Sequence, residues 1–131
     1  MANPKRKYAD LPEHIAALEE AGLLQRIDEP VNKDTEMHPL VRWQFRGGIP
    51  AKDRKAFLFT NITDTKGNTY DIPVIIGSLA ATPEIYGIGM NRPLEEINKA
   101  WQDAVANPIP PRTVKKAPCQ EVVISGDDLL G

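Results

Sequence analysis

The run Ile72-Pro73-Val74-Ile75-Ile76 constrains the fold more than any other stretch of this chain, because it is apolar at every consecutive position. A strand with one face in water alternates apolar and polar residues, whereas a strand covered on both faces does not. Pro73 stands near the start of the predicted strand 70–76, where its missing N–H donor does least harm. We therefore predict an α/β (α+β) fold with a small mixed β-sheet flanked by helices on both sides.

Capping residues predict four helices around this sheet. They run from the N-cap Asp10 to Gly22, over residues 39–46 before Gly47 and Gly48, from Thr82-Pro83 to a stop at Gly87 and Gly89, and from the cap Asn91 to Asn107-Pro108. Further strands are predicted at residues 23–28, 56–62 and 121–125. The chain then divides into a flexible tail (1–9), an α/β domain (10–106), a proline-rich connector (107–118) and a strand segment (119–131).

Composition excludes several classes of protein. Sixteen basic residues against eighteen acidic ones give a net charge of −2, so neither nucleic acid nor an anionic membrane is an expected partner. The single cysteine, Cys119, cannot form an internal disulfide and suits a reducing compartment. The sequence has no apolar run long enough to span a bilayer and no signal peptide, so the expected location is the cytoplasm.

Histidines and cysteine offer little chemistry at the sequence level. His14 lies beside Leu11 and Leu18 on the first helical stripe, which favours a packed histidine over a catalytic one. His38 precedes Pro39 as a residue of a helix start, and neither histidine has a partner at metal-ligand spacing. Cys119 has no nearby histidine and no CxxC partner, so structural burial is favoured over a nucleophilic role.

Three further stretches allow both a functional and a structural interpretation. The two glycines of Gly87-Ile88-Gly89-Met90-Asn91-Arg92 precede a helix as in phosphate-binding loops, but a third glycine is missing, so helix termination is the better account. Arg42, Trp43, Phe45 and Arg46 mix cations with aromatic rings, and a helix with a buried aromatic side explains them as well as nucleic-acid binding does. Asp127 and Asp128 are adjacent rather than convergent, as a carboxylate pair would need to be. No catalytic, cofactor-binding or metal-binding residue is assigned.

Several segments together resemble the N-terminal domain of the UbiD-type decarboxylases, enzymes that use prenylated FMN. They are the helix from Asp10-Leu11 to Ala21-Gly22, Arg26-Ile27-Asp28-Glu29-Pro30-Val31, Ala56-Phe57-Leu58-Phe59-Thr60-Asn61-Ile62, Tyr70-Asp71-Ile72-Pro73-Val74, and the closing stretches 108–112 and 121–128. The order and spacing of these segments carry the resemblance. It implies that this chain is the N-terminal domain of a larger enzyme, with residues 119–131 leading into a flavin-binding barrel domain.

The resemblance implies a reversible, non-oxidative decarboxylation of an aromatic or α,β-unsaturated carboxylic acid. In that family the prenylated FMN, held with a divalent metal (Mn or Mg) and K⁺, serves as the electron sink. The family's glutamate-arginine-glutamate network and its flavin and metal ligands belong to the barrel domain, beyond Gly131. We therefore expect this chain alone to bind none of these cofactors and to be inactive.

The expected partners are the remaining domains of the decarboxylase, and the complete enzyme is expected to form a homo-oligomer. An alternative keeps the same fold: a stand-alone, non-catalytic subunit or interaction module that docks onto a separate catalytic chain. A third possibility, an independent ligand-binding domain that uses the segment near Gly87, has little support in the sequence.

Overall fold

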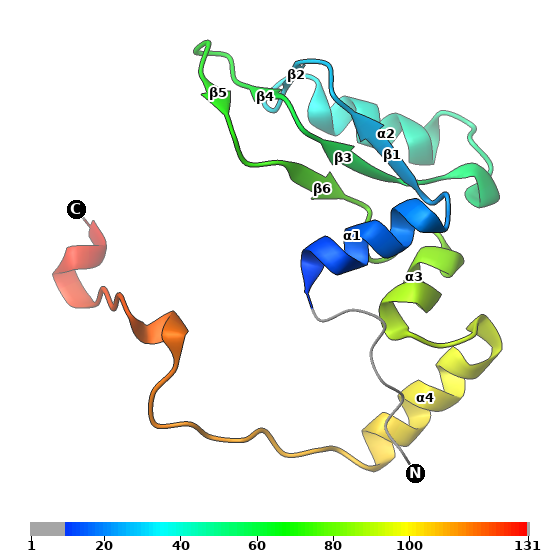
Figure 1. Ribbon diagram of the computed structural model, residues 1–131, viewed down its shortest axis with the longest axis vertical. Coiled ribbons are helices and arrows are strands. Elements are labelled where there is room, and N and C mark those ends of the chain that lie inside the picture. Colours follow the sequence, from blue (N-terminus) through cyan, green and yellow to red (C-terminus); the bar gives the residue numbers. More distant parts are fainter. Residues whose placement is uncertain (1–9, 131) are drawn as a thin grey trace. The chain divides into compact units, whose positions relative to one another are not determined.

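Four α-helices and six short strands are present in the described part of the chain (Figure 1). The structure, a computed structural model, describes residues 10–130, so the predicted tail 1–9 lies outside the described residues. The helices are α1 (Leu11–Glu20), α2 (Met37–Arg46), α3 (Pro83–Met90) and α4 (Leu94–Ala106). The strands are β1 (Leu24–Ile27), β2 (Val31–Asn32), β3 (Ala56–Phe59), β4 (Ile62–Thr63), β5 (Thr69–Tyr70) and β6 (Val74–Ile76).

The strands form two three-stranded ladders of the same mixed pattern. In the order β1-β3-β6, β1 pairs parallel with β3 and β3 pairs antiparallel with β6. In the order β2-β4-β5, the first pair is again parallel and the second antiparallel. Hydrogen bonds from Thr60 N to Ile27 O (3.1 Å) and from Val31 N to Asn61 O (3.0 Å) connect the two ladders. The predicted strands 56–62 and 70–76 are therefore each divided in two, at residues 60–61 and 71–73.

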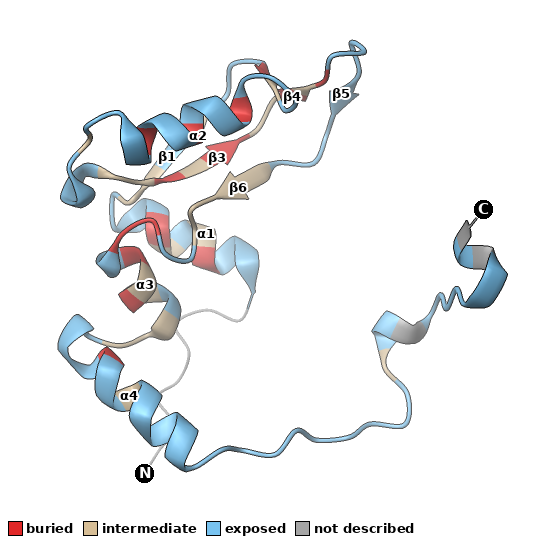
Figure 2. Ribbon diagram, turned by 180° about the vertical axis from the view of Figure 1, so that it is seen from behind, coloured by how far each residue is buried: buried red, intermediate tan, exposed pale blue. Residues whose placement is uncertain are grey.

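Helices cover both faces of the sheet, as the apolar run at residues 72–76 predicts (Figures 1 and 2). Side chains alternate along β3, so Phe59 faces α2 whereas Ala56 faces α1 and α3. The cluster on the α2 side consists of Val31, Met37, Val41, Phe59 and Ile62. The cluster on the other side consists of Leu18, Ala56, Ala81 and Ile85. The α+β fold with a small helix-flanked mixed sheet is confirmed.

The N-caps predicted for α1 and α3 are confirmed. The Asp10 side chain accepts a hydrogen bond from Glu13 N (3.0 Å) at the start of α1, and Gly22 follows that helix with a left-handed φ of 69°. The Thr82 hydroxyl accepts from Ile85 N (3.2 Å) at the start of α3. Capping is a local interaction, which is why the sequence predicts these termini well.

The predicted stop at Gly87 and Gly89 is wrong, because α3 runs through both glycines. It ends at Asn91, whose left-handed φ of 50° makes it the C-cap of α3 and not the N-cap of α4. Gly87 is buried where a Cβ would meet Arg92 O at 3.1 Å, so its role is close packing rather than helix termination. The helix α2 also begins at Met37, two residues before the predicted start at Pro39.

The described chain divides within α4 into a unit that ends at Ala100 and a unit that begins at Trp101. Of the apolar stripe in α4, Ile97 is buried in the first unit, whereas Trp101 and Val105 are exposed. The second unit continues without strands through residues 107–117 to the 3₁₀-helices Pro118–Gln120 and Gly126–Leu130. Residues 121–125 join no ladder of the described chain, which offers them no partner strand for their backbone hydrogen bonds.

Candidate functional site

The two histidines lie on helices that cover opposite faces of the sheet. His14 is only 4% exposed, and its Nε2–H donates to the Ser78 carbonyl oxygen at 2.8 Å, which joins α1 to the segment before α3. The packed histidine expected from the sequence is confirmed. His38 is exposed in the first turn of α2, consistent with the predicted helix-start position. The fold does not bring the two imidazoles together.

The burial of Cys119 predicted from the sequence is wrong. Cys119 is exposed within the 3₁₀-helix Pro118–Gln120. Asp127 and Asp128 both belong to the 3₁₀-helix Gly126–Leu130 instead of an extended segment.

The aromatic residues of α2 are exposed, contrary to the prediction of a buried aromatic side. Trp43 is 60% exposed and Phe45 is 40% exposed, whereas Gln44 is 3% exposed. Gln44 takes the buried position because Met37, Val41 and Gln44 form the stripe that faces the sheet. Its amide satisfies both backbone groups of Lys55 at the start of β3, which an aromatic ring could not do.

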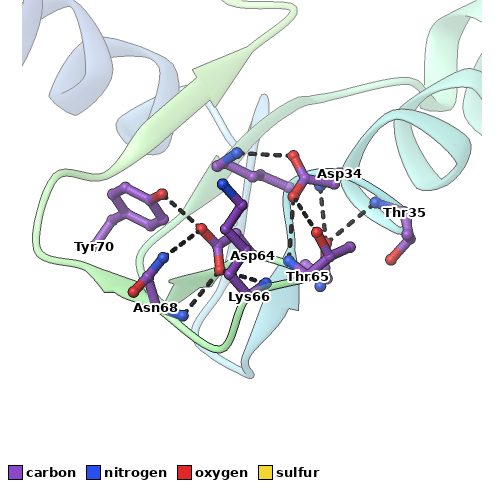
Figure 3. Close-up of polar contacts among 9 residues, drawn as sticks. Asp34, Thr35, Asp64, Thr65, Lys66, Asn68 and Tyr70 are labelled. Atoms are coloured by element: carbon purple, nitrogen blue, oxygen red, sulfur yellow. Dashed lines mark hydrogen bonds and ion pairs between the residues drawn. The ribbon is translucent and has the colours of Figure 1, made fainter.

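A polar cluster that the sequence interpretation missed surrounds Asp64 in the turn between β4 and β5 (Figure 3). The Asp64 carboxylate accepts four hydrogen bonds of 2.9 Å each. They come from Lys66 N, Asn68 N, Asn68 Nδ2 and the Tyr70 hydroxyl. Asp64 is buried, so these four bonds replace the water that its charge would otherwise bind. The spacing Asp64, Gly67, Asn68 is a turn signal that the sequence does contain.

A second carboxylate ties this turn to the segment between β2 and α2. Asp34 Oδ2 accepts from both the backbone nitrogen and the hydroxyl of Thr65 at 3.2 Å, and Asp34 Oδ1 accepts from Lys33 Nζ at 2.7 Å (Figure 3). Asn32 Oδ1 in turn accepts from the backbone nitrogens of Asp34 (2.9 Å) and Thr35 (3.2 Å). The cluster thus joins segments that are about thirty residues apart in the chain.

The hydrogen bonds of this cluster shift the pKa values of its two aspartates and of Tyr70 away from neutral pH. Hydrogen bonds from Asn68, together with those from Tyr70 and Lys66, lower the pKa of Asp64 to about 2 despite its burial. The side-chain hydrogen bond with Lys33 lowers the pKa of Asp34, and the bond to Asp64 raises the pKa of Tyr70. A carboxylate with all its lone pairs engaged and so low a pKa exchanges no proton near neutral pH. We conclude that the cluster stabilises the turn and is not an acid-base site.

A groove of about 1010 Å³ lies along α1 and α3 in the first unit. Small or apolar residues line it together with three carboxylates, those of Glu13, Glu20 and Glu84, and one cation, Arg92. A flavin phosphate needs converging donors or cations, and three carboxylates oppose it. The glycines at 87 and 89 lie inside α3, where the backbone is committed to helical bonding, so they form no phosphate-binding loop.

This groove therefore does not fit the phosphate of prenylated FMN. In the described part of the chain, no three His, Cys, Asp or Glu side chains converge in a way that could hold the divalent metal. Within the same described range, no helix is long and apolar enough to cross a membrane.

Fold and surface together describe an α+β module whose ionisable side chains cap helices and fix turns. Residues 15–105 match the family model described as the 3-octaprenyl-4-hydroxybenzoate carboxy-lyase N-terminal domain. The match covers more than half of the chain, and the chain therefore belongs to this UbiD N-terminal domain family. The matched range includes every strand of the structure and both faces of the sheet.

Proposed function

We propose that this chain is the N-terminal domain of a carboxy-lyase that decarboxylates an aromatic or α,β-unsaturated acid reversibly with prenylated FMN. The observation that carries the proposal is the family match over residues 15–105. In this proposal the module is a scaffold that packs beside a flavin-binding domain. In it, the flavin, the divalent metal and K⁺ are bound by that neighbouring domain.

Exposed apolar residues near the C-terminal end of the described chain support this division of labour. Val122, Val123 and Ile124 are 74%, 75% and 58% exposed, and they follow one another in the sequence. A β-branched apolar run has high strand propensity and is rarely left in water. We propose that residues 119–131 become a strand of the neighbouring domain, which would bury these side chains and satisfy their backbone groups.

The test compares the 131-residue chain with the product of the complete reading frame in which it is encoded. Both are produced with prenylated FMN and Mn²⁺, and carbon dioxide release is measured with a panel of hydroxybenzoates and cinnamates. We expect turnover from the complete product and none from the 131-residue chain. Turnover by this chain alone would overturn the scaffold role, and absence of turnover by a flavin-loaded complete product would overturn the proposed reaction class.

The same preparations test the proposed assembly. The complete protein is expected to sediment as a homo-oligomer, held by regions outside residues 10–130. If the reading frame encodes only this module, activity should instead require a separate catalytic chain that co-purifies with it.

A further inference from the structure

The helix α2 presents a cationic and aromatic surface that neither the core nor the polar cluster uses. Successive residues of an α-helix are 100° apart, so Arg42 and Arg46 lie one turn apart on the side opposite the buried stripe. Trp43 lies beside them at 60% exposure, and Leu40 adjoins Trp43 one turn earlier at 39% exposure. We call Leu40, Arg42, Trp43 and Arg46 the α2 outer face. Figure 2 shows this helix in pale blue where it faces away from the sheet.

The charge of this surface is not neutralised within the described chain. The segment Met37–Arg46 contains no acidic residue, and no described Asp or Glu forms an ion pair with Arg42 or Arg46. A further cation contacts this helix, because Arg54 stacks on Phe45 with its guanidinium carbon 5.3 Å from the ring centroid. Arginine and tryptophan are the residues that contribute most at protein-protein interfaces.

We propose that the α2 outer face is a docking surface for an acidic segment of a partner protein. The segment would place carboxylates against Arg42 and Arg46, and an apolar side chain between Leu40 and Trp43. Charge complementarity argues for this occupant. A nucleic acid fits less well, because two arginines on one short helix are a small footprint and the chain as a whole carries a net charge of −2. The inference does not depend on the proposed decarboxylase role.

The experiment titrates the ¹⁵N-labelled 131-residue chain with a synthetic peptide that carries two glutamates four residues apart and a leucine between them. A control peptide has glutamine at both acidic positions. We expect shifts confined to α2 and to the Trp43 indole N–H, and weaker binding by the control peptide. Arg42→Glu, Arg46→Glu and Trp43→Ala should each weaken binding about tenfold. Salt at about 0.5 M should weaken it as well.

Lys99→Glu provides the matched charge reversal, since Lys99 is exposed on α4 in the same unit. Binding by this variant should equal wild type, and circular dichroism should show all four variants folded. The proposal is overturned if the acidic peptide does not bind at about millimolar concentration, if its shifts map elsewhere, or if Lys99→Glu weakens binding as much as Arg46→Glu. Tighter, arginine-dependent binding of a single-stranded oligonucleotide or of anionic vesicles would also overturn it.

Discussion

The side-chain amide of Gln44 in α2 forms hydrogen bonds with both the backbone N–H and the backbone carbonyl of Lys55. The side-chain amide nitrogen of Gln44 donates to the Lys55 carbonyl oxygen at 2.9 Å, and the Lys55 backbone nitrogen donates to Gln44 Oε1 at 2.6 Å. Lys55 directly precedes β3, so the amide of Gln44 acts as a neighbouring strand would at that point. This pair fixes α2 against the end of the central strand.

Replacing Gln44 by leucine should destabilise the fold, because two backbone groups of Lys55 lose their partners. We expect a loss of about 2 kcal/mol in the free energy of unfolding, measured by urea titration. Gln25→Leu is the control, since Gln25 is exposed and should change stability by less than about 0.5 kcal/mol. Equal effects of the two substitutions would contradict the special position of Gln44.

Asp64 should make stability depend on pH in the acid range. Its pKa is about 2 in the folded chain, against about 3.9 for an aspartate in an unfolded one. A lowered folded pKa contributes stability that is present above the unfolded pKa and is lost as pH falls from about 4 through about 2. In Asp64→Asn this pH-dependent part should disappear. Urea midpoints at several values in this interval measure it, and the exposed control Asp71→Asn should keep the wild-type profile.

Two glycines of α3 should respond to alanine in opposite directions. A Cβ at Gly87 would meet Arg92 O and Leu94 Cδ2, both at 3.1 Å, and the carbonyl belongs to backbone that cannot easily give way. Gly87→Ala should therefore lower stability by about 1–3 kcal/mol. A Cβ at Gly89 would meet only His14 Cε1 at 3.9 Å, so Gly89→Ala should raise stability by up to about 1 kcal/mol through helix propensity. Thermal unfolding compares them, and a change of the same sign in both would refute the packing role of Gly87.

The cap of α1 gives a fourth prediction. Asp10→Ala removes the acceptor for Glu13 N and should lower stability by about 1 kcal/mol. Asp10→Asn keeps an acceptor oxygen at the same place, so its stability should stay within a few tenths of a kcal/mol of wild type. Helical content by circular dichroism and urea midpoints follow both variants. A loss as large in Asp10→Asn as in Asp10→Ala would argue against capping as the cause.

Little of the candidate site could be predicted from the sequence. The four hydrogen bonds to Asp64 come from residues within six positions of it, so its turn signal is local. The bond that ties this turn to Asp34 spans thirty-one residues, from Asp34 to Thr65. The α2 outer face depends on which side of α2 meets the sheet. Met37 and Val41 in the core, and Gln44 bonded to Lys55, place that side away from Trp43. The tie from Asp34 to Thr65 and the orientation of α2 both arise from contacts between segments that are distant in the chain. Sequence patterns within ten or fifteen consecutive residues cannot predict such long-range contacts.

The sequence by itself determined the termini of α1 and the start of α3, because a cap acts within one turn of its own residue. The consecutive apolar run at residues 72–76 also predicted helices on both sheet faces, although Ile72 itself lies outside β6 and is 76% exposed. Only the tertiary structure decided that Gly87 continues a helix, that Trp43 faces outward and that residues 121–125 join no ladder. The reason is that close packing, burial of a helix face and the pairing of strands all depend on other parts of the fold. These tertiary contacts outweigh local propensity.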